Sequence, residues 1–181
     1  LVRKQQYVKV CETIKETMEN ERDEEFRFIL MGELVLYYEL AGDYCASLYW
    51  ARRKSENYGH LPAAWTSLAG WYFYSTRPGR PTTEDMLKAL GYLETALDKT
   101  KASGASPLYV LFEVCRVLTA LKDYPKLERT MRAILKKSET HRCADSYRLE
   151  AEWLKTIPDG CLDDGLVTQF NLLIDPNWKL E

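Results

Sequence analysis

The residues that could bind a metal ion are few and widely spaced. His141-x-Cys143 is the closest pairing of a histidine with a cysteine, and the other histidine, His60, lies far away in the sequence. Structural zinc requires four nitrogen or sulfur ligands at tight spacing, so this pair predicts a buried thiol beside a surface imidazole and no metal site. The acidic segment 159–165 suggests a calcium loop, but it lacks the alternating oxygen ligands and the closing Glu of an EF-hand. We interpret it as a turn followed by a helix N-cap.

The patterns that mark catalytic nucleophiles are also missing from the sequence. There is no Gly-x-Ser-x-Gly elbow, no Gly-rich phosphate loop and no family pattern around a cysteine. With two histidines in the chain, general-base chemistry would fall mainly to carboxylates, which we expect on solvated helix faces. We therefore predict no catalytic residue, no cofactor and no enzymatic activity.

The balance of charged residues argues against a nucleic-acid-binding protein. Lys and Arg total 25 and Asp and Glu total 27, giving a formal net charge of −2, whereas polyphosphate binders usually show a clear basic excess. The most apolar stretch, 26–41, is interrupted by Arg27, Glu33 and Glu39 and is too short to span a bilayer. We expect neither nucleic-acid binding nor membrane insertion.

Cysteine usage favours a reducing compartment. The five cysteines are odd in number, widely spaced and without a Cys-x-x-Cys motif: Cys11, Cys45, Cys115, Cys143 and Cys161. This usage is typical of reduced, mostly buried thiols in a cytoplasmic protein. The chain begins with Leu1 and not with Met, from which we expect a fragment of a longer polypeptide.

Hydrophobic periodicity predicts helices along nearly the whole chain. The expected helices cover about 5–19, 24–41, 44–58, 62–74, 83–102, 106–121, 123–138 and 140–156, with a shorter one at 164–173. Gly42 is a predicted C-cap, Asp43 an N-cap and Pro62 a first helical residue. Either a Thr82-x-x-Asp85 capping box or Thr83 is expected to cap the helix that follows. The segment 75–83 contains two prolines and a glycine and is expected to be irregular. No segment alternates with period two, so the predicted fold class is all-α.

The apolar stripes of the first three helices predict which side chains face the core. The expected inward residues are Tyr7, Cys11, Ile14 and Met18; then Phe28, Met31, Leu34, Val35 and Tyr38; then Ala46, Tyr49 and Trp50. Aromatic residues are dense in 37–74, and four are consecutive at 71–74. Most should pack between helices, while some should face a groove. Arg52-Arg53-Lys54 with Arg77 and Arg80 could receive an acidic segment, although a solvated helix face and loop are the simpler interpretation.

A repeated pattern links these helices into hairpins. Ala64-x3-Leu68-Ala69-x2-Tyr72 is followed by Lys88-Ala89-x2-Tyr92-Leu93-x2-Ala96-Leu97, and the turns at 42–44 and 122–124 lie about two 40-residue repeats apart. The pattern resembles tetratricopeptide repeats and, over 61–104, their Sel1-like relatives. Arg53 and Lys54 depart from it where the family prefers Ala. The resemblance implies antiparallel hairpins stacked as a superhelix, and an irregular helical bundle is the alternative.

The same resemblance implies a domain organisation and a function. It places an N-terminal helix over 1–23, three to four hairpins over 24–156, and a C-terminal cap or tail over 157–181. The first helix of each hairpin would line a concave groove that binds a peptide segment or a partner protein. The implied groove residues are Leu36, Glu39, Thr66, Phe73, Tyr109, Phe112 and Arg116. The alternative function is structural, as a self-associating scaffold or a piece of a larger α-solenoid.

Overall fold

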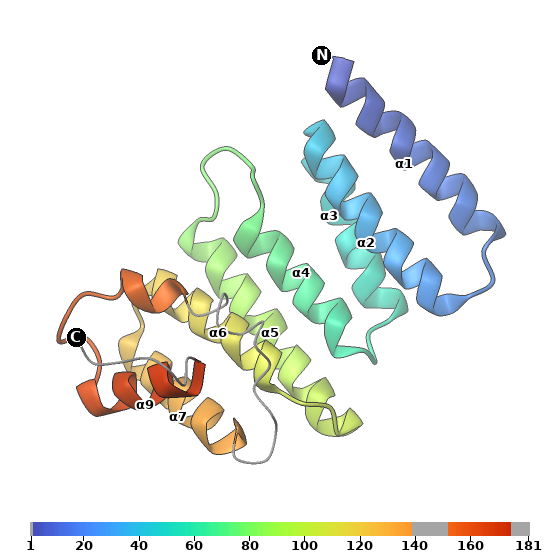
Figure 1. The fold of residues 1–181 in the computed structure, drawn as a ribbon. Coiled ribbons are helices and arrows are strands. Elements are labelled where there is room, and N and C mark those ends of the chain that lie inside the picture. The colour runs from blue at the N-terminus through green and yellow to red at the C-terminus, as the bar shows by residue number, and fades with distance from the viewer. Residues whose placement is uncertain (1, 139–151, 175–181) are drawn as a thin grey trace. The chain divides into compact units, whose positions relative to one another are not determined.

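The computed structural model describes residues 2–138 and 152–174, and every regular element in them is helical (Figure 1). The elements are α1 (Val2–Asn20), α2 (Glu24–Ala41), α3 (Tyr44–Asn57), α4 (Pro62–Tyr74), α5 (Thr83–Ser103), α6 (Leu108–Leu121), α7 (Tyr124–Ser138), the 3₁₀ helix η1 (Glu152–Thr156) and α9 (Asp164–Ile174). The all-α prediction is confirmed for these residues. The helix predicted over 140–156 lies outside the described residues except for its last turn, which is η1.

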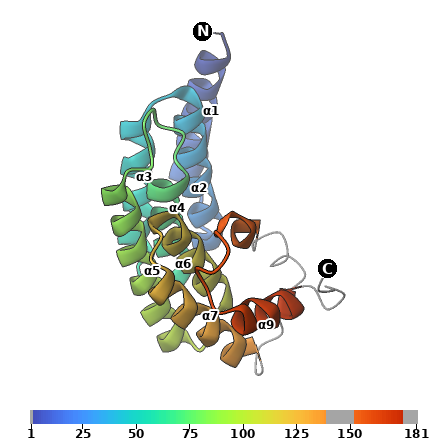
Figure 2. The same cartoon turned by 90° about the vertical axis from the view of Figure 1, so that its left-hand side faces the viewer.

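The chain divides into two compact units, Leu1–Ala96 and Leu97–Glu181. The boundary between the two units falls inside α5. Within the first unit, α1 packs against α2, α2 against α3, and α3 against α4. Neighbouring helices run in opposite directions in both views (Figures 1 and 2). This order of packing fits an arrangement of helical repeats.

Residues at the helix ends explain where the first unit turns. Gly42 follows α2 with φ 82°, a left-handed conformation that glycine adopts without steric cost. The Asp43 carboxylate then accepts a hydrogen bond from the Ala46 N–H at 3.0 Å and begins α3. Pro62 is the first residue of α4, where its missing N–H removes no intrahelical bond. These three predicted caps are confirmed.

The core of the first unit lies between α1, α2, α3 and α4. Its buried members are Cys11, Met18, Leu30, Met31, Leu34, Tyr38, Tyr58 and Ala64. The N-terminal half of α5 joins α4 through aromatic stacking, because the Tyr92 ring lies 6.1 Å from Trp65 and 5.6 Å from Tyr72, centroid to centroid. Most of the predicted inward residues of α1 and α2 lie in or against this core, whereas Tyr7 and Val35 are partly buried and are not part of it.

The predicted inward face of α3 is correct for Ala46 and Trp50, which are partly buried against the core, and wrong for Tyr49. Tyr49 is 55% exposed, and the buried residues of this helix are Ser47, Ala51, Lys54 and Ser55. Small side chains at Ser47 and Ala51 let α3 approach its neighbours closely, whereas the Tyr49 ring lies further round the helix. The buried side of α3 therefore carries small side chains at Ser47, Ala51 and Ser55, with the large Lys54 as the exception.

The second unit consists of the C-terminal part of α5 with α6, α7, η1 and α9. Helix α6 packs against α7 and η1, and α9 packs against α7 (Figures 1 and 2). Phe170 of α9 is fully buried, with its ring centroid 5.7 Å from that of Phe112 and 5.9 Å from that of Trp153. The short helix predicted at 164–173 is thus present and covers apolar surface of its unit.

Candidate protein-binding groove

A cavity of about 260 Å³ opens in the first unit between α2 and α4. Helix α2 contributes Gly32, Val35, Leu36 and Glu39, helix α4 contributes Ser67, Gly70, Trp71 and Tyr74, and Ser75 and Lys54 complete the lining. Lys54 belongs to α3, which packs against both α2 and α4. The lining therefore consists of two flanking helices and a lysine from the helix between them. We call this cavity and the adjoining exposed face of α2 the groove.

An exposed apolar stripe runs along α2 beside the cavity. Its large side chains are Phe26, Ile29, Leu36 and Leu40, all exposed. With Glu33 included, successive positions lie three, four, three and four residues apart, so they occupy one side of the helix. Leu36 belongs to both the stripe and the cavity lining, which makes the two surfaces continuous.

Lys54 brings a buried positive charge to the cavity. The residue is 6% exposed, and its Nζ lies 3.8 Å from the centroid of the Phe28 ring. Gly32 leaves room for the ammonium, because a Cβ added at this glycine would come within 3.0 Å of Nζ. Burial lowers the pKa of Lys54 to about 8, and the negative charge of Glu33 only partly opposes this shift. Its predicted place on a solvated helix face was wrong.

A chain of hydrogen bonds fixes the helices around the cavity. The Trp71 Nε1–H donates to Ser47 Oγ at 2.8 Å, and the Ser47 hydroxyl donates to the Val35 carbonyl at 2.8 Å. These three residues belong to α4, α3 and α2 respectively. Because both polar side chains are buried, their hydrogen bonds link the three helices without leaving an unsatisfied donor.

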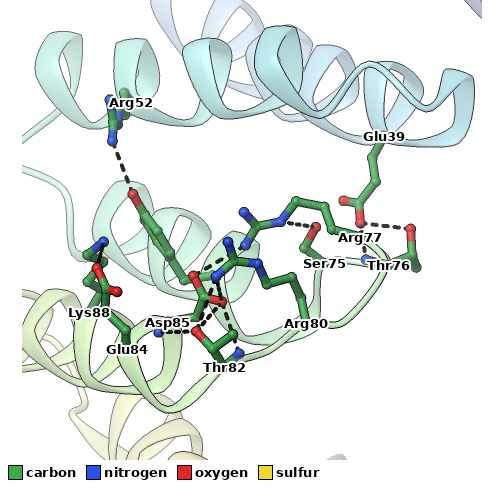
Figure 3. Close-up of polar contacts among 11 residues, drawn as sticks. Glu39, Arg52, Ser75, Thr76, Arg77, Arg80, Thr82, Glu84, Asp85 and Lys88 are labelled. Atoms are coloured by element: carbon green, nitrogen blue, oxygen red, sulfur yellow. Dashed lines mark hydrogen bonds and ion pairs between the residues drawn. The ribbon is translucent and has the colours of Figure 1, made fainter.

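The loop between α4 and α5 contacts two residues that line the cavity, Glu39 and Trp71. Glu39 Oε1 accepts hydrogen bonds from the Thr76 backbone N–H at 2.5 Å and from its hydroxyl at 3.1 Å. The Arg77 guanidinium lies 3.9 Å from the centroid of the Trp71 ring. Figure 3 shows Glu39 reaching this loop from α2. The loop is thereby attached to both flanking helices.

Asp85 organises the other end of this loop. Its carboxylate accepts hydrogen bonds from the Thr82 N–H at 3.0 Å and from Arg80 at 2.5 Å, and Arg77 lies 3.5 Å away (Figure 3). The Asp85 N–H donates in return to Thr82 Oγ1, so the predicted capping box is confirmed. Burial alone would raise the pKa of Asp85, but the Thr82 and Arg80 hydrogen bonds outweigh it and lower that pKa to about 2.

Comparisons with protein-family models, curated proteins and solved structures found no match.

The predicted groove residues are placed in different environments. Leu36 and Glu39 line the cavity. Thr66 and Phe73 lie on α4, partly buried, but neither is among the lining residues: the Thr66 hydroxyl donates to the Ala63 carbonyl, and the Phe73 ring contacts Tyr74. The first unit therefore brings together two of its four predicted residues.

The other three predicted residues belong to the second unit. Tyr109 is exposed, and Arg116 forms an ion pair with Glu113 at 3.5 Å. Phe112 is 0% exposed because Phe170 of α9 packs against it, so the prediction that Phe112 faces a groove is wrong. The cap or tail predicted over 157–181 had no predicted position over α6.

Residues 2–138 and 152–174 contain neither a metal-binding cluster nor a membrane-spanning helix. No group of three His, Cys, Asp or Glu side chains is arranged there to hold a metal ion. In the same residues, no helix has the length and apolar character needed to cross a bilayer. The pair His141 and Cys143 lies outside the described residues.

Proposed function

We propose that this chain is a protein-interaction module that binds a helical peptide segment of a partner in the groove between α2 and α4. The observation that carries this proposal is the continuity between the exposed apolar stripe of α2 and the cavity, which meet at Leu36. Fully burying one leucine side chain contributes about 1.5–3 kcal/mol. Several exposed apolar residues in one row therefore offer a partner helix enough contact area for specific binding.

The resemblance to tetratricopeptide repeats supports the same proposal. In this interpretation α2 and α4 are the first helices of consecutive hairpins, and α3 is the second helix of the earlier hairpin. Leu36 and Glu39, which the resemblance implied as groove residues, line the cavity. Membership of a repeat family remains a proposal and rests on the quoted sequence pattern and on the order in which the helices pack.

Leu36→Glu, with Leu87→Glu as its control, tests the proposed groove. Leu36 is 49% exposed on α2 and Leu87 is 56% exposed on α5, so both variants place a new charge in place of an exposed leucine. Peptides are first selected from a random display library with the unmodified chain, and their affinities are measured by fluorescence polarisation. We expect Leu36→Glu to weaken the selected peptides by about tenfold or more and Leu87→Glu to leave them unchanged.

The same two variants distinguish peptide binding in the groove from the alternative function, self-association as a scaffold. Equal loss of binding in both variants, or no loss in either, would place the peptide elsewhere on the chain. Sedimentation of the chain alone tests self-association. A concentration-dependent dimer that Leu36→Glu dissociates would instead assign the α2 stripe to contacts between copies of the chain.

A further inference from the structure

We propose that Lys54 binds the carboxylate of an acidic side chain on the partner helix, so that the groove recognises an Asp or Glu within an apolar helix face. This inference rests on the proposed function and adds the chemistry of the ligand. It starts from a charged group that lines the cavity and is itself more than nine-tenths buried. A buried ammonium is costly unless an anion or a set of hydrogen-bond acceptors accompanies it.

Within the described part of the chain, the Lys54 ammonium has no carboxylate partner of its own. Glu33 of α2 raises the pKa of Lys54 electrostatically, but the two groups form no ion pair within 4.0 Å. Glu39, which lines the same cavity, instead directs Oε1 to the backbone and hydroxyl of Thr76. The Lys54 Nζ instead faces the Phe28 ring, which attracts a cation without supplying an anion. A carboxylate from outside the chain would complete the charge balance.

The shape of the exposed surface favours an internal acidic residue over a chain end. The stripe extends from Phe26 to Leu40, a rise of about 21 Å along a helix. The part of α2 that lines the cavity, from Gly32 to Glu39, lies inside this span. A helix that follows the stripe therefore extends about 9 Å beyond Gly32 and ends about one residue beyond Glu39. Side chains over the Gly32 end of the cavity then come from within the helix, which favours an Asp or Glu side chain over a chain terminus as the source of the carboxylate.

The test uses designed amphipathic peptides of about 16 residues, long enough to cover the stripe. Each carries a Leu and Ile face with a single Glu, which is moved turn by turn along that face, and each has a partner with Gln in place of Glu. A third set ends at the Glu position with either a free carboxylate or an amide. Affinities are measured by fluorescence polarisation for the unmodified chain, Lys54→Met and Arg53→Met. Arg53 is the exposed neighbour on α3 and serves as the matched control.

We expect at least one Glu peptide to bind the unmodified chain about tenfold more tightly than its Gln partner. Lys54→Met should abolish this difference while Arg53→Met preserves it. Circular dichroism melting checks that both variants are folded. The ¹³Cε resonance of Lys54 provides a second measurement: the pKa of this group should rise with the Glu peptide and stay unchanged with the Gln peptide. Besides Lys54, the titrating groups on α2 and α4 near this site are Glu33, Glu39 and Tyr74.

Each remaining outcome overturns a defined part of the proposal. A Glu preference that persists in Lys54→Met, or is absent at every position, refutes the role of Lys54. In that case the Gln peptides still test the groove through Leu36→Glu. If the peptides with a free terminal carboxylate bind more tightly than both the amidated peptides and the internal Glu peptides, Lys54 recognises a chain terminus and not an acidic side chain. If no peptide binds, Gln peptides included, the proposed function and this inference both fail.

Discussion

The Lys54 ammonium lies 3.8 Å from the centroid of the Phe28 ring, on the side of α2 where Gly32 leaves space for it. Phe28 and Gly32 are one helical turn apart, so the aromatic ring and the gap face the same direction. The tetratricopeptide pattern that the sequence resembles has Ala at the position of Lys54. Here the position is occupied by a charged lysine, which is buried between helices. The arrangement has opposing effects on stability: burial penalises the ammonium, whereas the ring attracts it.

Lys54→Met should stabilise the folded chain at neutral pH. A fall in the pKa of Lys54 from its usual 10.5 to about 8 corresponds to a penalty of up to about 3 kcal/mol for the buried charge. The lost cation–π attraction offsets up to about 2 kcal/mol. The free energy of unfolding at pH 7, measured by urea denaturation, should therefore rise by about 1 kcal/mol.

The pH dependence of the same variant provides a stricter check. Between about pH 8 and 10.5 the unfolded chain binds a proton at Lys54 that the folded chain has released. Stability contributed by this group therefore rises with pH across that window, and the rise should be absent in Lys54→Met. Arg53→Met, on the exposed side of α3, should leave both the slope and the stability at pH 7 almost unchanged. An identical slope in the original chain and in Lys54→Met would show that Lys54 has its usual pKa.

Ser47→Ala should destabilise the first unit by about 1–3 kcal/mol. The substitution removes the acceptor of the buried Trp71 Nε1–H and the donor to the Val35 carbonyl. Urea denaturation followed by tryptophan fluorescence measures the loss. Ser55→Ala is the matched control, because Ser55 is also buried on α3 but donates only to the Arg52 carbonyl in its own helix. If Ser47→Ala and Ser55→Ala lowered the free energy of unfolding equally, the hydrogen bonds of Ser47 to Trp71 and Val35 would add no more stability than a bond within one helix.

The fold was predictable where local chemistry determines it. Gly42, Asp43 and Pro62 act within a few residues of their own positions, and their roles as caps were read directly from the sequence. The burial of Lys54 on α3 was not predictable in this way. Lys54 is buried because Gly32 and Phe28 of another helix accommodate it, and no local pattern records that contact. The signal in the sequence was a lysine at a position where the tetratricopeptide pattern that the sequence resembles has Ala.

The candidate site shows the same contrast. Leu36 and Glu39 were predicted from the alignment of hairpin turns, and both line the cavity. Phe112 was misplaced because α6 is buried almost all the way round, with residues 110–115 all buried in succession. Such a helix has no distinct polar face from which a groove-lining side could be identified. Its position under α9 depends on tertiary contacts with Phe170.

Asp85→Asn should weaken the connection between α4 and α5, and the loss should depend on pH. Burial opposes ionisation of Asp85, but hydrogen bonds from Thr82 and Arg80 lower its pKa from 3.8 to about 2. Between these two pH values the unfolded chain binds the proton and the folded chain does not. The carboxylate therefore contributes about 2 kcal/mol of stability above pH 4, which is lost as the pH falls to about 2.

Acid titration of stability, followed by circular dichroism, measures this contribution. The original chain should lose stability more steeply below pH 4 than Asp85→Asn does, and the two should converge near pH 2. Glu84→Gln is the control, because Glu84 is exposed and pairs only with Lys88 on the helix surface. If Asp85→Asn and Glu84→Gln gave the same acid profile, the capping box would have no measurable part in holding the loop.

Cysteine reactivity should distinguish the buried from the exposed thiols of the folded chain. Burial raises the pKa of Cys115 and of Cys11, and both side chains are inaccessible, so little thiolate is present to react with iodoacetamide. Cys45 is exposed on α3 and should be alkylated first. Peptide mass spectrometry after timed labelling at pH 8 should show Cys45 modified while Cys11 and Cys115 remain free, and denaturant should remove the difference. Native labelling of Cys115 at the rate of Cys45 would contradict the burial of α6, since its thiol reacts only where that helix separates from its neighbours.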